Sequence, residues 1–206
     1  MKTWKVLNLY AGIGGNRKLW ENVDVTAVEI NPKIAKIYQD FFPDDKVVIM
    51  DAHKFLLEHY DDGWDFIWSS PPCPTHSKIR ESGSKHGQYK VKYPDMNLYQ
   101  EIILLDRFFN SKWVVENVEP YYIPLIPGKV IGRHLFWSNF NLSKIKIKCD
   151  NINKGTMEDY RKRADLSKYV VENERRILRN MVNPKLGKHI LDCARKNIQQ
   201  TLVMIE

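Results

Sequence analysis

Short apolar runs alternate with amphipathic stretches along the first 120 residues of the chain. Runs rich in β-branched and aromatic residues are typical of buried strands, and they occur at 4–9, 23–29, 47–50, 64–69 and 113–115. Helical spacing follows most of them, starting near residue 16, at Asn31-Pro32, over 52–60 and over 95–109. Repeated strand–helix units predict an α/β fold with a mostly parallel sheet and helices on both faces.

The order changes after residue 127. Residues 129–140 favour two short strands, and Lys alternates with Ile over 144–148, as in a half-exposed edge strand. A final helix is predicted over about 173–201, with a break at Asn183-Pro184. Residues 74–94 have no clear periodicity and carry five basic residues against one acid, which is typical of a long functional loop or lid.

Composition places the chain among ordinary soluble proteins. It has 206 residues, of which 43% are hydrophobic and 28% are charged, enough for one domain with a core and a small appendage. No run approaches the roughly 18 apolar residues of a membrane span. Its three cysteines are widely spaced, which favours neither a disulfide framework nor a metal site. We therefore expect an intracellular, cytoplasmic protein without a membrane or metal partner.

Charge is distributed unevenly between the two parts of the chain. Residues 1–140 hold 17 basic and 17 acidic residues, whereas residues 141–206 hold 15 basic and 8 acidic residues, the whole formal charge of +7. A one-sided excess of this kind indicates a polyanionic partner. A solvated helical tail is the alternative interpretation.

Candidate functional residues follow the carboxyl ends of four predicted strands. The glycine turn around Gly12 follows the first strand, and Glu29, Asp51 and Cys73 follow the next three. Ligands of doubly wound sheets bind at this edge. Glu29 could accept the hydroxyls of a ribose or sit at a helix start, and Asp51 could bind an adenine amino group or cap a helix.

Cys73 follows Pro71-Pro72 directly, on a stiff and extended backbone. Such a backbone presents a nucleophile with little entropy left to lose. A buried, inert cysteine is the alternative. Glu116, at the end of the fifth strand, is expected beside Cys73.

In this order the motifs resemble the DNA (cytosine-5) methyltransferase family, over about residues 4–140 and 175–200. Residues 10–15 look like its Phe-x-Gly-x-Gly loop, with Tyr for Phe, and residues 70–73 look like its catalytic loop. Glu116-Asn117-Val118 is its Glu-Asn-Val, and residues 133–139 resemble the motif that holds the flipped base. Residues 179–184 resemble its Gly-Asn-x-Val-x-Pro motif.

The resemblance implies a Rossmann-like class I methyltransferase fold. It also implies that the protein transfers a methyl group from S-adenosylmethionine to carbon 5 of cytosine in double-stranded DNA. The Cys73 thiolate would add to carbon 6 of a flipped base, Glu116 would contact ring nitrogen 3 and the amine, and Arg133 or His134 would hold the carbonyl. The implied cofactor-binding residues are Tyr10, Ala11, Gly12, Gly14, Gly15, Glu29, Ile30, Asp51, Ala52, Pro71 and Asn180.

The sequence departs from the family pattern at several positions and in size. Pro74 replaces the usual Gln, Arg179 replaces a Gly, and only about 40 residues are available for target recognition. We expect a catalytic core over 1–140, a reduced DNA-binding segment over 141–172 and a returning C-terminal helix over 173–206. The expected DNA-binding residues are Lys78, Arg80, Lys85, Arg161, Lys162 and Arg163.

So small a recognition segment favours a short target or a restriction or specificity partner, and it suggests a phage or bacterial origin. Three other functions stay open. An amino-methyltransferase shares Ser70-Pro71-Pro72 but has an aromatic residue in place of Cys73. An RNA cytosine-5 methyltransferase shares the catalytic loop, and a decayed enzyme could still bind nucleic acid.

Overall fold

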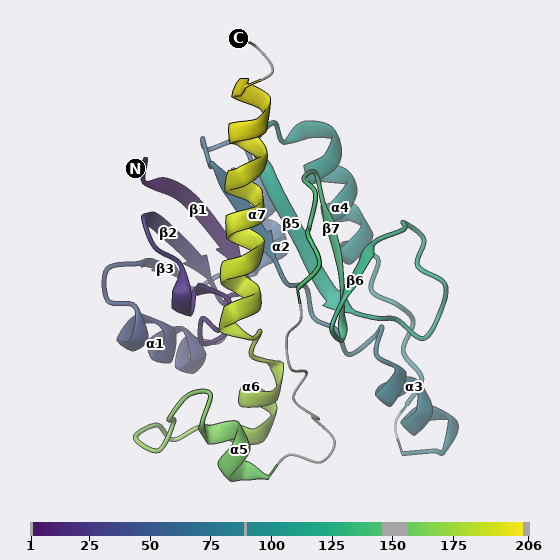
Figure 1. Cartoon of the computed structure of the whole chain (residues 1–206). Helices are drawn as coiled ribbons and strands as arrows, with labels where there is room; N and C mark the ends of the chain where they lie inside the picture. Colours follow the sequence, from purple (N-terminus) through teal and green to yellow (C-terminus); the bar gives the residue numbers. More distant parts are fainter. Residues whose placement is uncertain (1, 89, 146–155, 204–206) are drawn as a thin grey trace.

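Five parallel strands form the centre of the protein. The computed structural model describes residues 2–88, 90–145 and 156–203. The parallel strands lie in the order β3-β2-β1-β4-β5 (Figure 1). Their bounds are β1 Trp4–Leu9, β2 Val23–Val28, β3 Lys46–Val48, β4 Phe66–Ser69 and β5 Lys112–Val118. The predicted Rossmann-like α/β fold is confirmed.

Two antiparallel strands complete one edge of the sheet. β7 (His134–Ser138) pairs with β5, and β6 (Lys129–Ile131) pairs with β7. Both were expected between residues 129 and 140. In this pairing Val118 lies opposite His134 and Glu116 opposite Phe136, so the β5 acid lies close to the start of β7.

Helices cover both faces of the sheet, as predicted. α7 (Pro184–Val203) lies across one face (Figure 1). Its residues Leu186, Ile190 and Ala194 belong to one buried cluster with Phe66 and Trp68 of β4. On the other face, α2 (Ala52–His59) and α4 (Asn97–Phe108) cover Ile67. Successive β4 residues point to opposite faces, and each face is buried, which explains why β4 is a continuous apolar run.

The prediction of a helix starting near Asn16 is wrong. The chain forms only a three-residue 3₁₀ helix, η1 (Arg17–Leu19), before β2 begins. α7 occupies the adjacent space: a Cβ added to Gly187 would lie 2.2 Å from the backbone oxygen of Asn16. A C-terminal helix therefore takes the place that a helix after β1 would fill, and the glycine turn has no long helix behind it.

The region between β4 and α4 is not wholly a loop. α3 (Lys78–Lys85) interrupts it, with an i,i+4 ion pair between Glu81 and Lys85. Its apolar positions are too few to show a helical period, so the pattern missed it. α1 (Pro32–Phe41) begins as predicted, with Asn31 as N-cap accepting from Lys33 N at 2.9 Å.

The C-terminal part contains α5 (Met157–Arg161), α6 (Glu174–Asn180) and α7. The predicted break at Asn183-Pro184 is confirmed, and Asn183 Oδ1 accepts from Lys185 N at 2.9 Å. Tyr160 and Leu166 pack with Ile13 and Ile37, so this segment is attached to the core beside the glycine turn.

Lys144 and Ile145 belong to no strand, and the rest of the edge strand expected over 144–148 lies outside the described residues. None of the helices in the described part of the chain has the length and apolarity needed to cross a membrane.

Candidate active site

A cavity of about 530 Å³ opens at the carboxyl ends of β1, β2, β4 and β5. It lies where the strand order reverses, between β1 and β4, the usual ligand site of such sheets. Its volume is in the range of small-molecule sites. Nearly all predicted catalytic and cofactor residues line it: Tyr10, Ala11, Gly12, Gly15, Glu29, Ile30, Asp51, Ala52, Pro71, Cys73, Glu116, Arg133, His134 and Asn180.

Gly14 is the exception among the predicted cofactor residues. It does not line the cavity, and a Cβ added there would lie 2.2 Å from the Phe42 ring, so this glycine serves packing against α1. Both glycines have a positive φ, +55° at Gly12 and +78° at Gly14, but only Gly12 has open space where a Cβ would point. A ligand can therefore approach the backbone closely at Gly12.

Glu29 is held in place by two backbone amides. Its carboxylate accepts from Gly12 N at 3.0 Å and from Asn31 N at 2.9 Å, which joins the glycine turn to the start of α1. Asp51 accepts from Lys54 N at 2.9 Å and caps α2 while also lining the cavity. The helix-start and cap interpretations thus hold for residues that also line the cavity.

The Pro-Pro-Cys turn is fastened to the end of β5. Asn117 Nδ2 donates to the Pro71 carbonyl at 2.9 Å. Ser70 Oγ donates to Glu116 Oε2 at 2.8 Å and accepts from Trp68 Nε1 at 2.8 Å. These contacts bring Cys73 and Glu116 to one wall of the cavity, as the sequence predicted.

Electrostatics at this wall oppose ionisation of the thiol. Burial raises the pKa of Cys73, and the Glu116 charge raises it further, whereas Arg133 and Arg179 lower it by a smaller amount. The positive charge that favours a thiolate is therefore present but does not dominate in the unliganded protein.

Arg133 and His134 have different surroundings. His134 Nε2 lies 3.4 Å from Glu116 Oε1, and burial lowers the pKa of His134, so this imidazole is neutral near pH 7. Arg133 Nη2 donates to the Arg179 carbonyl at 2.8 Å and keeps its charge, although burial lowers its pKa. His134 is thus a partner of Glu116, and Arg133 is the cation of the site.

The six basic residues expected to bind DNA do not line the cavity. Arg161 forms a bidentate pair with Glu174 at 2.9 Å, and Lys162 contacts Asp159 at 3.0 Å. Lys78 pairs with Glu119, and Lys85 with Glu81. The Arg163 guanidinium lies 5.5 Å from the Tyr160 ring centroid, and Arg80 extends from α3.

Sequence reasoning missed several lining residues from α6 and the turn after it, namely Arg176, Ile177, Met181 and Val182. They flank the expected Asn180, so their nearness in sequence was the available signal. Among the described residues, neither Arg176 nor Arg179 forms an ion pair.

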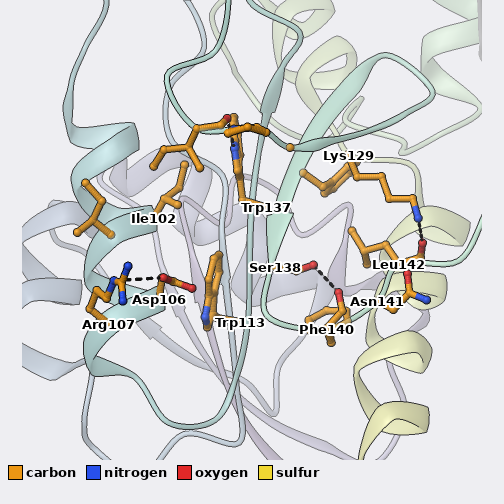
Figure 2. Close-up of a pocket in the computed structure, with 15 residues that line it drawn as sticks. Ile102, Asp106, Arg107, Trp113, Lys129, Trp137, Ser138, Phe140, Asn141 and Leu142 are labelled. Atoms are coloured by element: carbon orange, nitrogen blue, oxygen red, sulfur yellow. Dashed lines mark hydrogen bonds and ion pairs between the residues drawn. The ribbon is translucent and has the colours of Figure 1, made fainter.

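A second cavity of about 530 Å³ lies between α4 and the β6–β7 edge (Figure 2). Trp113, Trp137 and Phe136 dominate its lining. Its polar groups are engaged locally, since Ser138 Oγ donates to the Phe140 carbonyl at 2.8 Å and Trp137 Nε1 to the Ile126 carbonyl at 2.9 Å. Its lining contains no cysteine and none of the residues predicted for catalysis or cofactor binding, so the first cavity is the candidate active site.

Residues 4–120 match the family described as C-5 cytosine-specific DNA methylase. No curated protein matches the chain significantly.

Among solved structures, a hypothetical protein of Thermus thermophilus is 18% identical, with a TM-score of 0.44 over 65% of this chain and 73% of its own. A DNMT2 mutant of Spodoptera frugiperda is 25% identical, with a TM-score of 0.40 over 56% of this chain and 35% of its own. A putative DNA modification methyltransferase of an Escherichia coli prophage is 21% identical, with a TM-score of 0.37 over 58% of this chain and 33% of its own. The chain thus spans about a third of the length of these two methyltransferases.

Proposed function

Because the chain belongs to the C-5 cytosine-specific DNA methylase family, we propose that it methylates carbon 5 of cytosine in double-stranded DNA through a covalent bond to Cys73. Family membership makes the chain a methyltransferase with S-adenosylmethionine as its methyl donor. One observation carries the proposal: Cys73 and Glu116 line the same cavity as Gly12, Glu29 and Asp51. Nucleophile and nucleoside-binding groups therefore share one space.

The residues around the glycine turn fit the cofactor. The open side of Gly12 would admit a ligand against the backbone, and the Glu29 carboxylate, held by two amides, would accept the ribose hydroxyls. Asp51 would accept from the adenine amino group, and Ile30, which is 63% exposed, would pack against the adenine ring. When bound, S-adenosylmethionine supplies an electrophilic methyl group.

Cytosine carbon 5 is too electron-poor to attack a methyl group directly, so Cys73 first activates the ring. Its thiolate forms a bond to carbon 6, which places electron density on carbon 5. Carbon 5 would then take the methyl group as the bond between that methyl and the sulfonium sulfur breaks, which leaves S-adenosylhomocysteine. Water would remove the carbon 5 proton, so that the carbon 5–carbon 6 double bond re-forms and the bond to the Cys73 sulfur breaks. The ring and the free thiolate are restored.

Glu116 would stabilise the negative charge that develops on the ring as the thiolate adds, by donating a proton to ring nitrogen 3 and accepting a hydrogen bond from the amine. Ser70 and His134 hold its two oxygens in place. A neutral His134 leaves Arg133 as the group that would hold the base carbonyl and favour the thiolate.

The residues that we propose as the main DNA contacts differ from those expected from the sequence. Lys78, Lys85, Arg161 and Lys162 have acidic partners, so each phosphate contact would first break an ion pair. Arg176 lies at the cavity mouth, and Arg179 is close enough for its charge to lower the pKa of Cys73. We therefore propose that Arg176 and Arg179 make the main phosphate contacts.

The short 141–172 segment leaves room for few base contacts, and each good pair contributes roughly 1–3 kcal/mol of discrimination. We expect a target of two to four base pairs, or a partner protein that supplies specificity. We also propose that the enzyme acts with a restriction partner and is of phage origin. Methylome sequencing of plasmid DNA from cells that express the chain would identify the target.

Covalent trapping tests the chemistry. Duplex DNA with 5-fluorocytosine at the target should form a stable adduct, because fluorine blocks the final elimination. Cys73→Ala should abolish the adduct and leave cofactor binding intact, whereas Cys193→Ala, a second buried thiol on α7, should still form it. An adduct with the Cys73 variant would refute the assignment.

Mass spectrometry of the product separates the alternatives. We expect 5-methylcytosine in DNA. N4-methylcytosine or N6-methyladenine would indicate an amino-methyltransferase, and trapping of fluorinated RNA in place of DNA would move the activity to RNA. Cofactor binding without any methyl transfer would indicate a decayed enzyme.

A further inference from the structure

A buried carboxylate lies beneath the candidate site and is absent from every motif above. Glu101 of α4 has no exposed surface. It accepts from Tyr10 Oη at 2.6 Å, from Ser69 Oγ at 2.5 Å and from His53 Nδ1 at 3.0 Å. All three partners are side chains from segments far away in sequence.

Each partner belongs to a segment that forms the cavity. Tyr10 opens the glycine turn, and His53 follows Asp51 and Ala52 at the start of α2. Ser69 ends β4 and directly precedes Ser70, which holds Glu116. One carboxylate thus connects the cofactor side of the cavity with its catalytic side.

Three side chains satisfy the buried Glu101 carboxyl group. Burial and the neighbouring Glu101 charge raise the pKa of Tyr10, so its hydroxyl stays protonated and donates. The hydrogen bond to Glu101 raises the pKa of His53. A buried charge is costly unless it is fully hydrogen-bonded, and three donors satisfy that requirement here.

Tyr10 also has a strained backbone. Its φ is +55°, in the left-handed region that disfavours bulky side chains. The hydrogen bond to Glu101 holds the side chain while the backbone turns into Ala11 and Gly12. Without that bond, the turn would relax toward ordinary dihedral angles and Gly12 would move relative to Glu29.

We propose that Glu101 is a positioning residue that fixes the glycine turn through Tyr10 and the Pro-Pro-Cys turn through Ser69. The interpretation of these two effects as cofactor affinity and catalysis rests on the proposed function. Two separable arms follow from the geometry: loss of the Tyr10 bond should affect the cofactor side, and loss of the Ser69 bond should affect Cys73.

Three variants test the arms, each measured by calorimetry with S-adenosylmethionine and by the alkylation rate of Cys73 with iodoacetamide. Tyr10→Phe should weaken cofactor affinity about threefold to tenfold, the range expected for one hydrogen bond, and leave Cys73 alkylation unchanged. Ser69→Ala should change the alkylation rate about threefold to tenfold with cofactor affinity unchanged. Glu101→Gln should move both.

Asp45→Asn is the matched control. Asp45 is also a buried acid, bonded to Tyr38 at 2.8 Å and to Arg17 at 2.9 Å, but none of these residues lines the cavity. It should lower the thermal midpoint as Glu101→Gln does and leave both readouts at wild-type values. A purely structural role for Glu101 would instead make the two variants alike.

The inference fails if Tyr10→Phe and Ser69→Ala both leave both readouts unchanged, or if Asp45→Asn moves them as much as Glu101→Gln. Alkylation of Cys73 needs neither DNA nor cofactor. It therefore tests Glu101 even if the wild-type protein traps no fluorinated DNA, which would refute only the proposed function.

Discussion

The side-chain amide of Asn117 donates a hydrogen bond to the backbone carbonyl of Pro71, 2.9 Å away. Asn117 is buried, and its Oδ1 accepts from Val118 N at 2.9 Å. The end of β5 thus fixes the turn that presents Cys73, and two prolines stiffen that turn further.

Asn117→Ala should slow covalent trapping by at least about tenfold, because the turn loses its anchor, and should lower the free energy of unfolding by about 1–3 kcal/mol. Asn139→Ala is the matched control. Asn139 accepts from Trp113 N at 3.1 Å and donates to the Ser111 carbonyl at 2.7 Å, at the opposite end of β5. Asn139 is exposed, so its loss should cost less stability than that of Asn117, and it should not slow trapping. Equal slowing of trapping by both variants would contradict the anchor.

Alkylation of Cys73 should accelerate as the pH rises through and above neutrality. Burial and Glu116 raise the pKa of this thiol, so the reactive thiolate is a minor form at pH 7 and grows with pH. Arg133→Gln removes a charge that lowers this pKa and should slow alkylation at pH 7.5 about twofold to fivefold. Peptide mass spectrometry would measure the rate, with Cys193 as internal reference; a pH-independent rate would contradict the assignment.

Asp51→Ser separates the two roles of that residue. Ser is a good N-cap, so the free energy of unfolding should change by less than about 0.5 kcal/mol. The shorter side chain cannot extend as far into the cavity, so we expect weaker binding of S-adenosylmethionine in calorimetry. Asp51→Ala should lose the cap as well, about 1 kcal/mol. Unchanged affinity in both variants would leave Asp51 as a cap alone.

The salt dependence of DNA binding should distinguish the two groups of basic residues. Each neutralised phosphate contributes about 0.9 to the slope of log affinity against log salt. Arg176→Gln with Arg179→Gln should therefore reduce the slope by about 0.9 to 1.8. Arg161→Gln with Lys162→Gln removes cations that are already ion-paired and should change it little. The reverse result in a fluorescence titration would return the DNA contacts to the 141–172 segment.

Gly187→Ala should destabilise the protein although alanine favours helices by about 1 kcal/mol over glycine. The added Cβ would lie 2.2 Å from the Asn16 oxygen and 2.7 Å from its Cα, so α7 would have to move off the sheet. We expect a loss of about 1–3 kcal/mol in chemical denaturation. Lys185→Ala, on the exposed first turn of α7, is the control and should be nearly neutral.

Local patterns in the sequence were enough to predict the parallel strands, the residues at their carboxyl ends and the break at Asn183-Pro184. These patterns are apolar runs bounded by turns, and prolines that cannot continue a helix. The carboxyl ends of parallel strands meet at one edge, so Glu29, Asp51, Cys73 and Glu116 could be placed together before any contact was known.

The remaining features required the folded chain, because they depend on contacts between residues far apart in sequence. Tyr10 and Glu101 are 91 residues apart, and no spacing rule connects them. Only a short 3₁₀ helix forms after Asn16, where α7 from the other end of the chain packs. Likewise the sequence gives the charge of Arg161 but not its ion pair with Glu174. A cation already paired with a carboxylate contributes less binding free energy when it contacts a phosphate.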